Sequence, residues 1–298
     1  QSFIVWQCRF GGGPVEAPAR CNKQTFMRID QLLVQRQLSS TRSQAQRLIS
    51  GGVEWHNGEA WRRVTKNGDD VPDDARIRLL DDSEARYVSR GGLKLEAALK
   101  HVGLSVANLQ CLDVGQSTGG FTDCLLQQGA EMVVGVDVGS AQLHPSLRAD
   151  PRVLCVEGVN ARALDASDLI AAYEDSISAG GQFDIENEEI DPDFVPEFDV
   201  VVADLSFISQ TLVLPAVVPL LKAGGCLLTL VKPQFELQPG QVGKGGIVKE
   251  AALYLVVEQR LREACASLGL DVTHWFDSPI AGGDGNREFF IAARKSGT

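Results

Sequence analysis

The sequence predicts an α/β fold: a Rossmann-like, mainly parallel sheet that ends in a β-hairpin, preceded by a small α+β unit. The first observation comes from residues 109–126, where a short apolar run, a glycine-rich turn and a helical pattern follow one another. This is the opening unit of nucleotide-binding α/β sheets. The second observation is that apolar runs of strand length alternate with helical patterns further along the chain. Such alternation is typical of a doubly wound sheet.

Residues 1–26 show no pattern that predicts a fold. Gly11–Gly13 and two nearby prolines break any helix, and the apolar run Phe3–Trp6 is too short for a signal peptide. We therefore expect residues 1–26 to be a disordered or non-native extension, and Met27 to be the functional start.

Residues 27–84 are expected to form the small α+β domain. Apolar residues at helical spacing follow Met27, and Ser40 or Thr41 can cap a second helix. An Asn57-Gly58 pair is typical of a tight primed turn between two strands. The expected order is a helix from Met27, a helix ended by Gly51-Gly52, a hairpin beginning with Val53–His56 and a closing strand over Ala75–Leu80.

Basic residues gather in this domain although the whole chain carries a net charge of −11. Residues 27–66 hold seven basic and three acidic residues. Arg42 and Arg47 lie on the second helix, whose apolar stripe faces inward, so its other face can meet phosphates. From charge alone, a solvated helix face is an equal alternative. The pattern R-x-D, followed by TRSQAQRLISGGV, resembles the S4-like RNA-binding domain, and we expect RNA contacts from Arg28, Arg42 and Arg47.

The glycine-rich turn after residue 114 narrows the choice of ligand. It places backbone N–H groups at a helix N-terminus, where a nucleotide can approach closely. A dinucleotide fingerprint needs a middle glycine, but Ser117 stands there between Gly115 and Gly120. This favours a nucleoside without a diphosphate, of which S-adenosylmethionine is the most common. A turn that merely joins a strand to a helix is the alternative. Asp137, which ends the second strand, can accept hydrogen bonds from ribose hydroxyls.

The remaining elements follow from periodicity and from their glycine and proline boundaries. The expected strands are Met132–Val136, Val153–Val156, Phe198–Ala203, Cys226–Val231, Val272–Asp277 and Glu288–Ala292, and the expected helices are Lys94–His101, Leu212–Leu221 and Glu250–Leu268.

An acidic stretch interrupts this pattern at residues 175–197. Between Asp184 and Asp199 there are eight acidic residues and no basic one. We expect an exposed insertion, and a metal site is the weaker interpretation because these acids have no fixed ligand geometry.

Four charged residues stand where predicted strands or helices begin or end: Lys94, Asp204, Lys232 and Glu288. In open α/β sheets the ligand crevice lies beyond the carboxyl ends of the strands. Two lysines and two carboxylates neutralise one another, which makes their partial burial tolerable. An ordinary strand-end charge is the alternative for any one of them.

Composition limits the other classes of protein. No apolar run approaches the roughly 18 residues that a membrane helix needs. The seven cysteines include no C-x-x-C pair, so we expect reduced thiols, a cytoplasmic protein and no metal.

The stretches SRGGLKLEAAL, DVGQSTGGFTD, VVADLSFIS, TLVKPQFE and DGNREFF make residues 85–298 resemble the FtsJ-like methyltransferase domain. Its fusion to an S4-like domain resembles the TlyA (hemolysin A) family of ribosomal RNA 2′-O-methyltransferases. The resemblance implies a class I methyltransferase sheet, S-adenosylmethionine as cofactor, and ribosomal RNA or ribosomal subunits as partner, with a cytidine modified.

The resemblance also implies the site residues. The family's Lys-Asp-Lys-Glu tetrad falls on Lys94, Asp204, Lys232 and Glu288, with Lys232 as base, Asp204 and Lys94 fixing its charge and position, and Glu288 orienting the hydroxyl or pairing with a lysine. The cofactor contacts fall on Asp113, Gly115, Ser117, Gly119, Gly120, Phe121, Asp137, Asn160 and Asp204.

The sequence departs from the family at the 175–197 insertion and at Gln116, where a small residue is usual. Neither departure removes a member of the tetrad. Two other functions stay open: a non-catalytic RNA-binding factor in ribosome assembly, which the complete tetrad disfavours, and a membrane-active hemolysin, which the missing apolar span disfavours.

Overall fold

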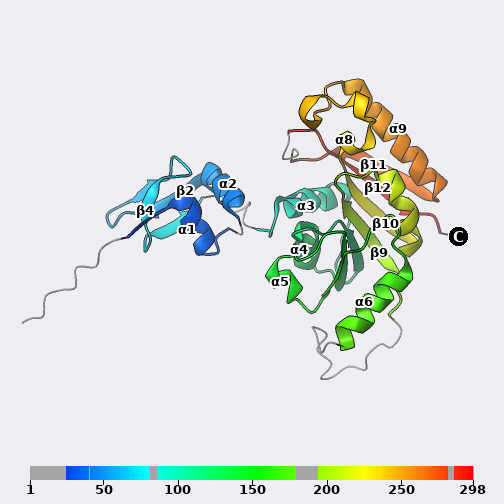
Figure 1. Cartoon of the computed structure of the whole chain (residues 1–298), viewed down its shortest axis with the longest axis horizontal. Helices are drawn as coiled ribbons and strands as arrows, with labels where there is room; N and C mark the ends of the chain where they lie inside the picture. Colours follow the sequence, from blue (N-terminus) through cyan, green and yellow to red (C-terminus); the bar gives the residue numbers. More distant parts are fainter. Residues whose placement is uncertain (1–24, 40, 81–85, 179–193, 281–284, 298) are drawn as a thin grey trace, which may run out of the picture.

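The computed structural model describes residues 25–39, 41–80, 86–178, 194–280 and 285–297. They form a small N-terminal domain and a larger α/β domain (Figure 1). Residues 1–24, the expected domain boundary at 84 and 85, and most of the acidic insertion lie outside the described residues.

The N-terminal domain contains the two predicted helices around one apolar core. The side chain of Thr41 caps the second helix by accepting a hydrogen bond from the backbone N–H of Gln44, as predicted. Apolar residues of both helices, among them Leu33 and Leu48, are fully buried together. The elements are β1 (Phe26–Arg28), α1 (Ile29–Gln35), α2 (Arg42–Gly52), β2 (Val53–His56), β3 (Trp61–Arg63), β4 (Asp70–Pro72) and β5 (Arg76–Leu79).

Two expectations for this domain are wrong. His56 lies opposite Trp61, so the hairpin has a four-residue loop instead of a two-residue primed turn. The side chain of Asn57 accepts hydrogen bonds from the N–H groups of Glu59 and Ala60, which stabilises this longer turn. The fold also begins before Met27, because Phe26 pairs with Pro72 between β1 and β4. Strands of three residues are too short to leave a periodic signal.

The larger domain is built on one seven-stranded sheet in the order β11-β12-β10-β9-β6-β7-β8. Strands β6 to β10 run parallel, and β12 runs antiparallel between β10 and β11. The predicted parallel sheet with its terminal hairpin is therefore confirmed. Its strands are β6 (Gln110–Val114), β7 (Met132–Asp137), β8 (Val153–Glu157), β9 (Phe198–Asp204), β10 (Leu221–Val231), β11 (Leu270–Asp277) and β12 (Phe289–Lys295).

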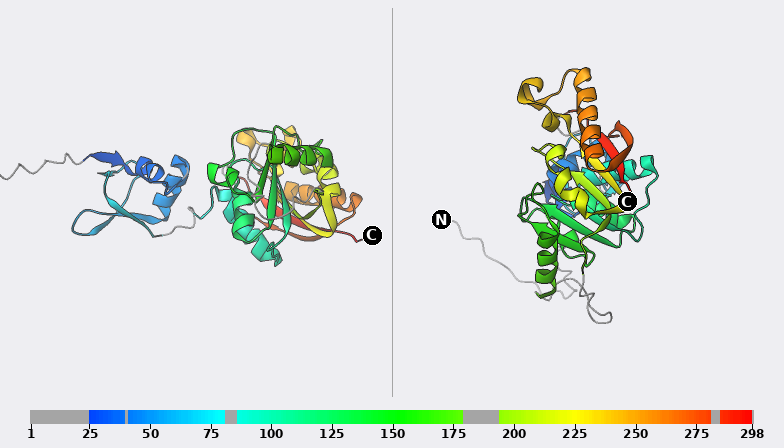
Figure 2. Two further views of the ribbon diagram at one scale, coloured as in Figure 1. Left: turned by 90° about the horizontal axis from the view of Figure 1, so that it is seen from below. Right: turned by 90° about the vertical axis from the view of Figure 1, so that its right-hand side faces the viewer.

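Helices cover both faces of this sheet (Figures 1 and 2). One core lies between the sheet and α3 (Arg90–Val102), α4 (Gly120–Gln127) and α5 (Pro145–Arg148). The other core lies between the sheet and α6 (Ala166–Ser178), α7 (Leu214–Val217) and α9 (Ala251–Ser267). Alternate residues of a strand enter different cores, as with Cys111 and Leu112 of β6.

The helix expected over Leu212–Leu221 is broken into short pieces. A 3-10 turn at Gln210–Leu212, α7, and a second 3-10 turn at Val218–Leu220 replace it. Pro215 and Pro219 explain the interruption, because proline donates no backbone hydrogen bond and clashes with the preceding turn. Strand β10 therefore begins at Leu221, five residues earlier than expected, with an irregular register before Cys226.

The described flanks of the acidic insertion belong to the fold. Helix α6 continues to Ser178, so the insertion begins later than residue 175. Phe194 stacks on Tyr173 of α6, with 4.6 Å between the ring centroids. Asp199 lies inside β9, where it pairs with Lys222 and accepts the N–H of Gln110. Residues 179–193 lie outside the described residues.

Candidate active site

The glycine-rich turn passes so close to its neighbours that a side chain would clash. Gly115 has a φ of +85°, and a Cβ there would lie 2.8 Å from the carbonyl oxygen of Asp204. Gly119, the cap of α4, has a φ of +96° and would meet Leu147 at 2.4 Å. The turn therefore requires glycine at both positions.

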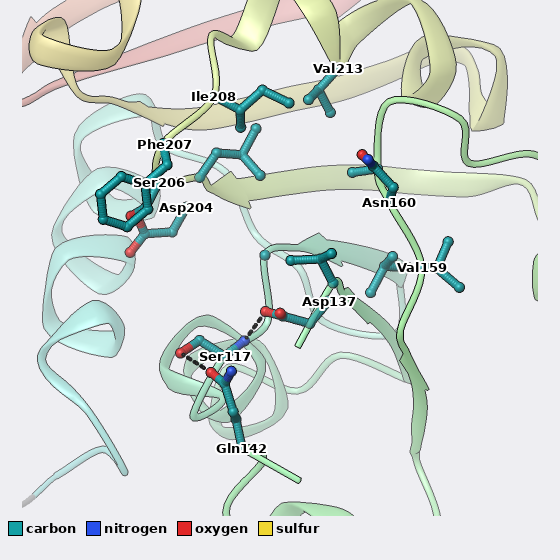
Figure 3. A pocket seen from close by; sticks show the side chains of 15 residues that line it. Ser117, Asp137, Gln142, Val159, Asn160, Asp204, Ser206, Phe207, Ile208 and Val213 are labelled. Atoms are coloured by element: carbon teal, nitrogen blue, oxygen red, sulfur yellow. Dashed lines mark hydrogen bonds between the residues drawn. The ribbon is translucent and has the colours of Figure 1, made fainter. Parts of the chain in front are cut away.

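A cavity of about 550 Å³ opens beside this turn, at the carboxyl ends of the parallel strands. Figure 3 shows Ser117, Asp137, Asn160 and Asp204 around it. The carboxylate of Asp137 accepts the N–H groups of Ser117 and Gly139, each at 2.7 Å. Apolar side chains complete the wall: Val136, Val138, Val159, Leu205, Ile208 and Val213.

A smaller cavity of about 200 Å³ adjoins the first. Both cavities are lined by Gly115, Ser117, Asp204 and Ser206. Gly120 and Phe121 line only the smaller cavity, as does Lys232. The two cavities thus lead from the strand ends around Asn160 to the amine of Lys232.

Sheet register brings three of the four predicted catalytic residues to one edge. Lys232 follows Val231, which pairs with Phe289, and Glu288 immediately precedes Phe289. Asp204, at the end of the neighbouring strand β9, pairs with Leu230 of β10. Lys94 reaches this edge from α3.

The tetrad is arranged as two ion pairs. Lys232 Nζ lies 2.5 Å from Asp204 Oδ1, and Lys94 Nζ lies 2.5 Å from Glu288 Oε2. The Lys94 and Glu288 side chains are only 10% and 4% exposed. Mutual neutralisation makes this burial tolerable, as the sequence predicted.

The structure adds Ser206, which sequence reasoning missed. Lys232 Nζ donates a hydrogen bond to Ser206 Oγ at 2.9 Å, so serine and carboxylate together fix the amine. Ser206 stands two residues after Asp204 in the matched stretch VVADLSFIS, which is the only signal that could have found it.

Two predicted cofactor residues do not line either cavity. Asp113 is fully buried beneath the turn, where the hydroxyl of Thr122 donates to its carboxylate at 2.7 Å. Burial raises the pKa of Asp113 to about 7, against the opposing effect of the Thr122 hydrogen bond. Asp113 therefore supports the turn from below, and Gly119 shapes it.

The unusual Gln116 belongs to the same buried network. Its amide nitrogen donates to the Thr122 hydroxyl at 2.9 Å. A Cβ at Gly135 would lie 1.9 Å from that amide nitrogen. The long side chain fits at position 116 because position 135 on the neighbouring strand has no side chain.

An exposed aromatic residue stands at the mouth of the larger cavity. Phe207 is 90% exposed, has a φ of +63°, and lies 5.0 Å from the ring of Phe235. The following residues are anchored by the buried carboxylate of Glu236, which accepts the Ser209 hydroxyl and the Gln210 N–H. Burial raises the pKa of Glu236.

The predicted RNA-binding arginines are partly engaged in the domain itself. Arg28 and Arg42 each lie 2.9 Å from the carboxylate of Asp30, whose side chain is fully buried. The hydrogen bond from Arg28 is the main reason that the pKa of Asp30 falls to about 2. Arg47 lies on α2 and is half-buried.

Within the described ranges, no group of three or more histidine, cysteine, aspartate or glutamate side chains is placed to hold a metal ion. No described helix is both long and apolar enough to cross a membrane.

Comparison with known proteins shows the family of this chain. The model of the FtsJ-like methyltransferase family matches residues 87–295. A 16S/23S rRNA (cytidine-2′-O)-methyltransferase, TlyA of Mycobacterium tuberculosis, is 40% identical over 90% of this chain and 89% of its own length. Hemolysin A of Brachyspira hyodysenteriae is 36% identical over 88% of this chain and 98% of its own length.

Solved structures show the same architecture. A Streptococcus thermophilus protein that carries the name hemolysin has a TM-score of 0.63 and 37% identity, covering 92% of this chain and 90% of its own. A Lactococcus lactis protein with the same name has a TM-score of 0.60 and 38% identity, covering 72% of this chain and 90% of its own.

Proposed function

Because the chain belongs to the FtsJ-like methyltransferase family, we propose that it transfers a methyl group from S-adenosylmethionine to a ribose 2′-hydroxyl of ribosomal RNA. The observation that carries this proposal is the Lys232–Asp204 ion pair at the wall of the cavity beside the glycine turn. The printed names of the relatives from Mycobacterium tuberculosis and Campylobacter jejuni support cytidine as the modified nucleotide.

The residues around the larger cavity fit a nucleoside with a sulfonium side chain. Asp137 offers carboxylate oxygens for ribose hydroxyls, and the amide of Asn160 offers a donor and an acceptor for a base edge. The apolar wall formed by Val138, Val159 and Ile208 suits the faces of a purine. When bound there, S-adenosylmethionine supplies a methyl group activated by positive sulfur.

The chain's own contribution is to position and deprotonate the ribose hydroxyl. A hydroxyl is a weak nucleophile at neutral pH and must lose its proton during attack. Lys232 is the proposed acceptor of that proton: its Nζ, which Asp204 and Ser206 hold in place, must first release one of its own protons, because an ammonium group has no lone pair. The buried Lys94–Glu288 pair keeps a second carboxylate fixed at the neighbouring strand end. Much of the rate then comes from orientation.

Phe207 provides a surface for the nucleobase next to the reacting ribose. Unstacked bases of RNA are commonly held on aromatic side chains. Phe207 projects from the cavity mouth, and its strained φ is maintained by a loop that Glu236 anchors. We assign it to stacking on the target base, with the N-terminal S4-like domain holding the RNA around it.

Methylation mapping tests the proposal. Purified chain is incubated with labelled S-adenosylmethionine and bacterial ribosomal subunits that lack this modification, and the rRNA is mapped by mass spectrometry. We expect a 2′-O-methylated cytidine that is absent when the protein is omitted. RNA binding without methyl transfer would favour the assembly-factor alternative. Leakage of dye from liposomes would favour the hemolysin alternative. A protein that acts on ribosomes would work in the cytoplasm.

A further inference from the structure

In the N-terminal domain, strands β3, β2 and β5 form a three-stranded sheet in that order. One face of this sheet is not packed against α1 or α2. Trp55, Ile77 and Leu79 pack against the domain core beneath α1 and α2. Side chains alternate along a strand, so their neighbours project from the opposite face. The members of this outer face, called the sheet face below, are Glu54, His56, Trp61, Arg63, Arg76 and Arg78.

Strand register gathers these residues into two rows. His56 lies opposite both Trp61 and Arg76, and forms one row with them. Glu54 lies opposite both Arg63 and Arg78, and forms the second row. The arginines are exposed and Trp61 is half-buried. Three guanidinium groups and one carboxylate therefore share a small surface in a chain whose net charge is −11.

The guanidinium groups of β5 are ordered by the tryptophan ring. The Arg78 guanidinium lies 4.3 Å from the centroid of the Trp61 ring, and that of Arg76 lies 5.7 Å from it. The His56 ring meets the same indole at 5.2 Å, nearly perpendicular to it. Arg78 also pairs with Glu54 at 2.5 Å, while 47% of its side chain stays exposed.

This combination has the chemistry of a single-stranded RNA surface. Guanidinium groups bind phosphate oxygens in a fork, and a guanidinium or indole plane accepts a nucleobase by stacking. Cation–π contacts hold these planes in place before binding, so little side-chain freedom is lost. An acidic protein partner would pair with the same arginines, but it has no nucleobases to stack on the indole and guanidinium planes.

We propose that the sheet face is a second RNA-binding surface of this protein, which holds a single-stranded or looped segment of its RNA substrate. The inference rests on the proposed function, because it takes ribosomal RNA as the substrate. It differs from the sequence prediction, which placed the RNA contacts on Arg28 and on Arg42 and Arg47 of α2. Arg28 and Arg42 are held by the buried Asp30, and Arg78 is likewise held by Glu54, but Arg76 and Arg78 also share the Trp61 ring on the outer face of the sheet.

The experiment measures the salt dependence of RNA affinity with the full chain. The probe is a fluorescein-labelled single-stranded RNA of about 20 nucleotides, long enough to span a binding groove. In the Arg76→Gln, Arg78→Gln variant, the slope of log affinity against log salt should fall by about one to two units, since each phosphate contact contributes about 0.7 for single strands. Trp61→Leu should weaken binding several-fold and leave the slope unchanged, because it removes stacking and no charge.

The matched control is Arg152→Gln, Arg262→Gln. These two arginines also form exposed ion pairs, with Asp150 and Glu258, but on the larger domain. This control should bind the probe like the wild type. The Arg76→Lys, Arg78→Lys variant keeps the charge and should keep the slope. Each variant should keep the circular dichroism spectrum and melting temperature of the wild type, which separates a binding effect from misfolding of the N-terminal domain.

The outcomes distinguish this inference from the proposed function. If the wild type methylates rRNA and the Gln variant keeps both affinity and slope, the sheet face does not bind RNA and the proposed function stands. If the control variant loses as much as the Gln variant, general charge explains the binding and the inference is wrong. A wild type that binds no RNA overturns the inference and the proposed function together. Capture of an acidic peptide in place of RNA would also overturn it.

Discussion

At the scale of single residues, the two lysines of the tetrad differ in role because their amines have different partners. Lys94 is buried against Glu288, so its charge supports the fold around the strand ends. Lys232 pairs with Asp204 and donates a hydrogen bond to Ser206, so its amine is fixed. Because Lys232 lines the smaller cavity, a substrate can also reach this amine. Of the two tetrad lysines, Lys232 is the one that combines a fixed position with a place in the cavity wall.

Lys232→Ala should abolish methyl transfer and leave S-adenosylmethionine affinity within about tenfold, because the amine acts on the RNA hydroxyl more than on the cofactor. Lys222→Ala is the matched control: Lys222 also pairs with an aspartate, Asp199, but at the opposite end of β9 and β10. It should methylate normally. Single-turnover rates and calorimetry give the two readouts. Appreciable turnover of Lys232→Ala near neutral pH would exclude Lys232 as the base.

Gln116 and Gly135 form a size-compensated pair beneath the turn. Gly135→Ala should lower the free energy of unfolding by about 1–3 kcal/mol, because the new methyl group overpacks against the Gln116 amide. Adding Gln116→Ala should recover part of that loss, although the hydrogen bond to Thr122 goes. A double-mutant cycle of urea titrations measures the coupling. Additive losses would show that the two positions do not compete for space.

At the scale of elements, Asp30 at the start of α1 pairs with Arg28 at the end of β1 and with Arg42 at the start of α2. Asp30→Asn should lower the free energy of unfolding by about 1.5–3 kcal/mol, the usual range for hydrogen bonds to charged groups. The folded-state pKa of about 2 lies below the unfolded value, so this stabilisation is present above about pH 4 and is lost as the pH falls towards 2.

Urea titrations at pH 7 and pH 3, followed by the fluorescence of Trp55 and Trp61 in the same domain, should show the Asp30 variant losing less stability on acidification than the wild type. Equal losses would mean that other carboxylates dominate acid unfolding. The same ion pair affects tests of RNA binding at Arg42. Arg42→Ala leaves the buried Asp30 carboxylate with one partner fewer, so it can weaken RNA binding by destabilising the domain.

The loop after β9 presents Phe207 to the substrate. Phe207→Ala should reduce kcat/KM for rRNA by about 5- to 150-fold, as expected from the loss of one stacked base, with cofactor affinity unchanged. Phe207→Trp should stay near the wild type because it keeps an aromatic plane. Leu255→Ala, at another exposed apolar residue on α9, serves as control. An equal loss in the tryptophan variant would point to shape rather than stacking.

Sequence patterns predicted four of the five parallel strands within a residue or two, because their apolar runs are bounded by glycine, aspartate or proline; the start of β10 was missed by five residues. They failed at the three-residue pair β1–β4, which tertiary contacts decide, and at the expected helix that Pro215 and Pro219 interrupt, where the local proline signal was overlooked. The site shows the same division. Asp204 and Lys232 could be identified because they stand at the ends of predicted strands. The burial of Asp113 and the hydrogen bond between Ser206 and Lys232 could not, because they depend on loop shape and on neighbours far along the chain.

At the scale of the whole molecule, the two domains have separate apolar cores and share a short segment. The amide of Gln44 on α2 donates to the carbonyl of Tyr87. Tyr87 is buried in the larger domain, and the N–H of Val88 donates to Asp123 on α4, the helix that begins at the glycine turn. Residues 86–88 therefore pack as part of the methyltransferase domain, and Tyr87 also contacts the N-terminal domain.

This placement predicts how the domain tolerates truncation. A fragment that starts at Arg86 keeps the buried Tyr87 ring and the Val88–Asp123 hydrogen bond, so it should fold and bind S-adenosylmethionine within about tenfold of the full chain while losing most of its affinity for rRNA. A fragment that starts at Ser89 lacks both contacts at the N-terminal end of α4. The Ser89 fragment should melt several degrees lower, since burying an aromatic ring contributes about 2 kcal/mol. It should also bind the cofactor more weakly, because α4 carries Gly120 and Phe121 of the cavity wall. Calorimetry and thermal melts of the two fragments side by side make the comparison. Equal melting temperatures and equal cofactor affinities would mean that residues 86–88 serve only as a tether and that the domain begins at Ser89.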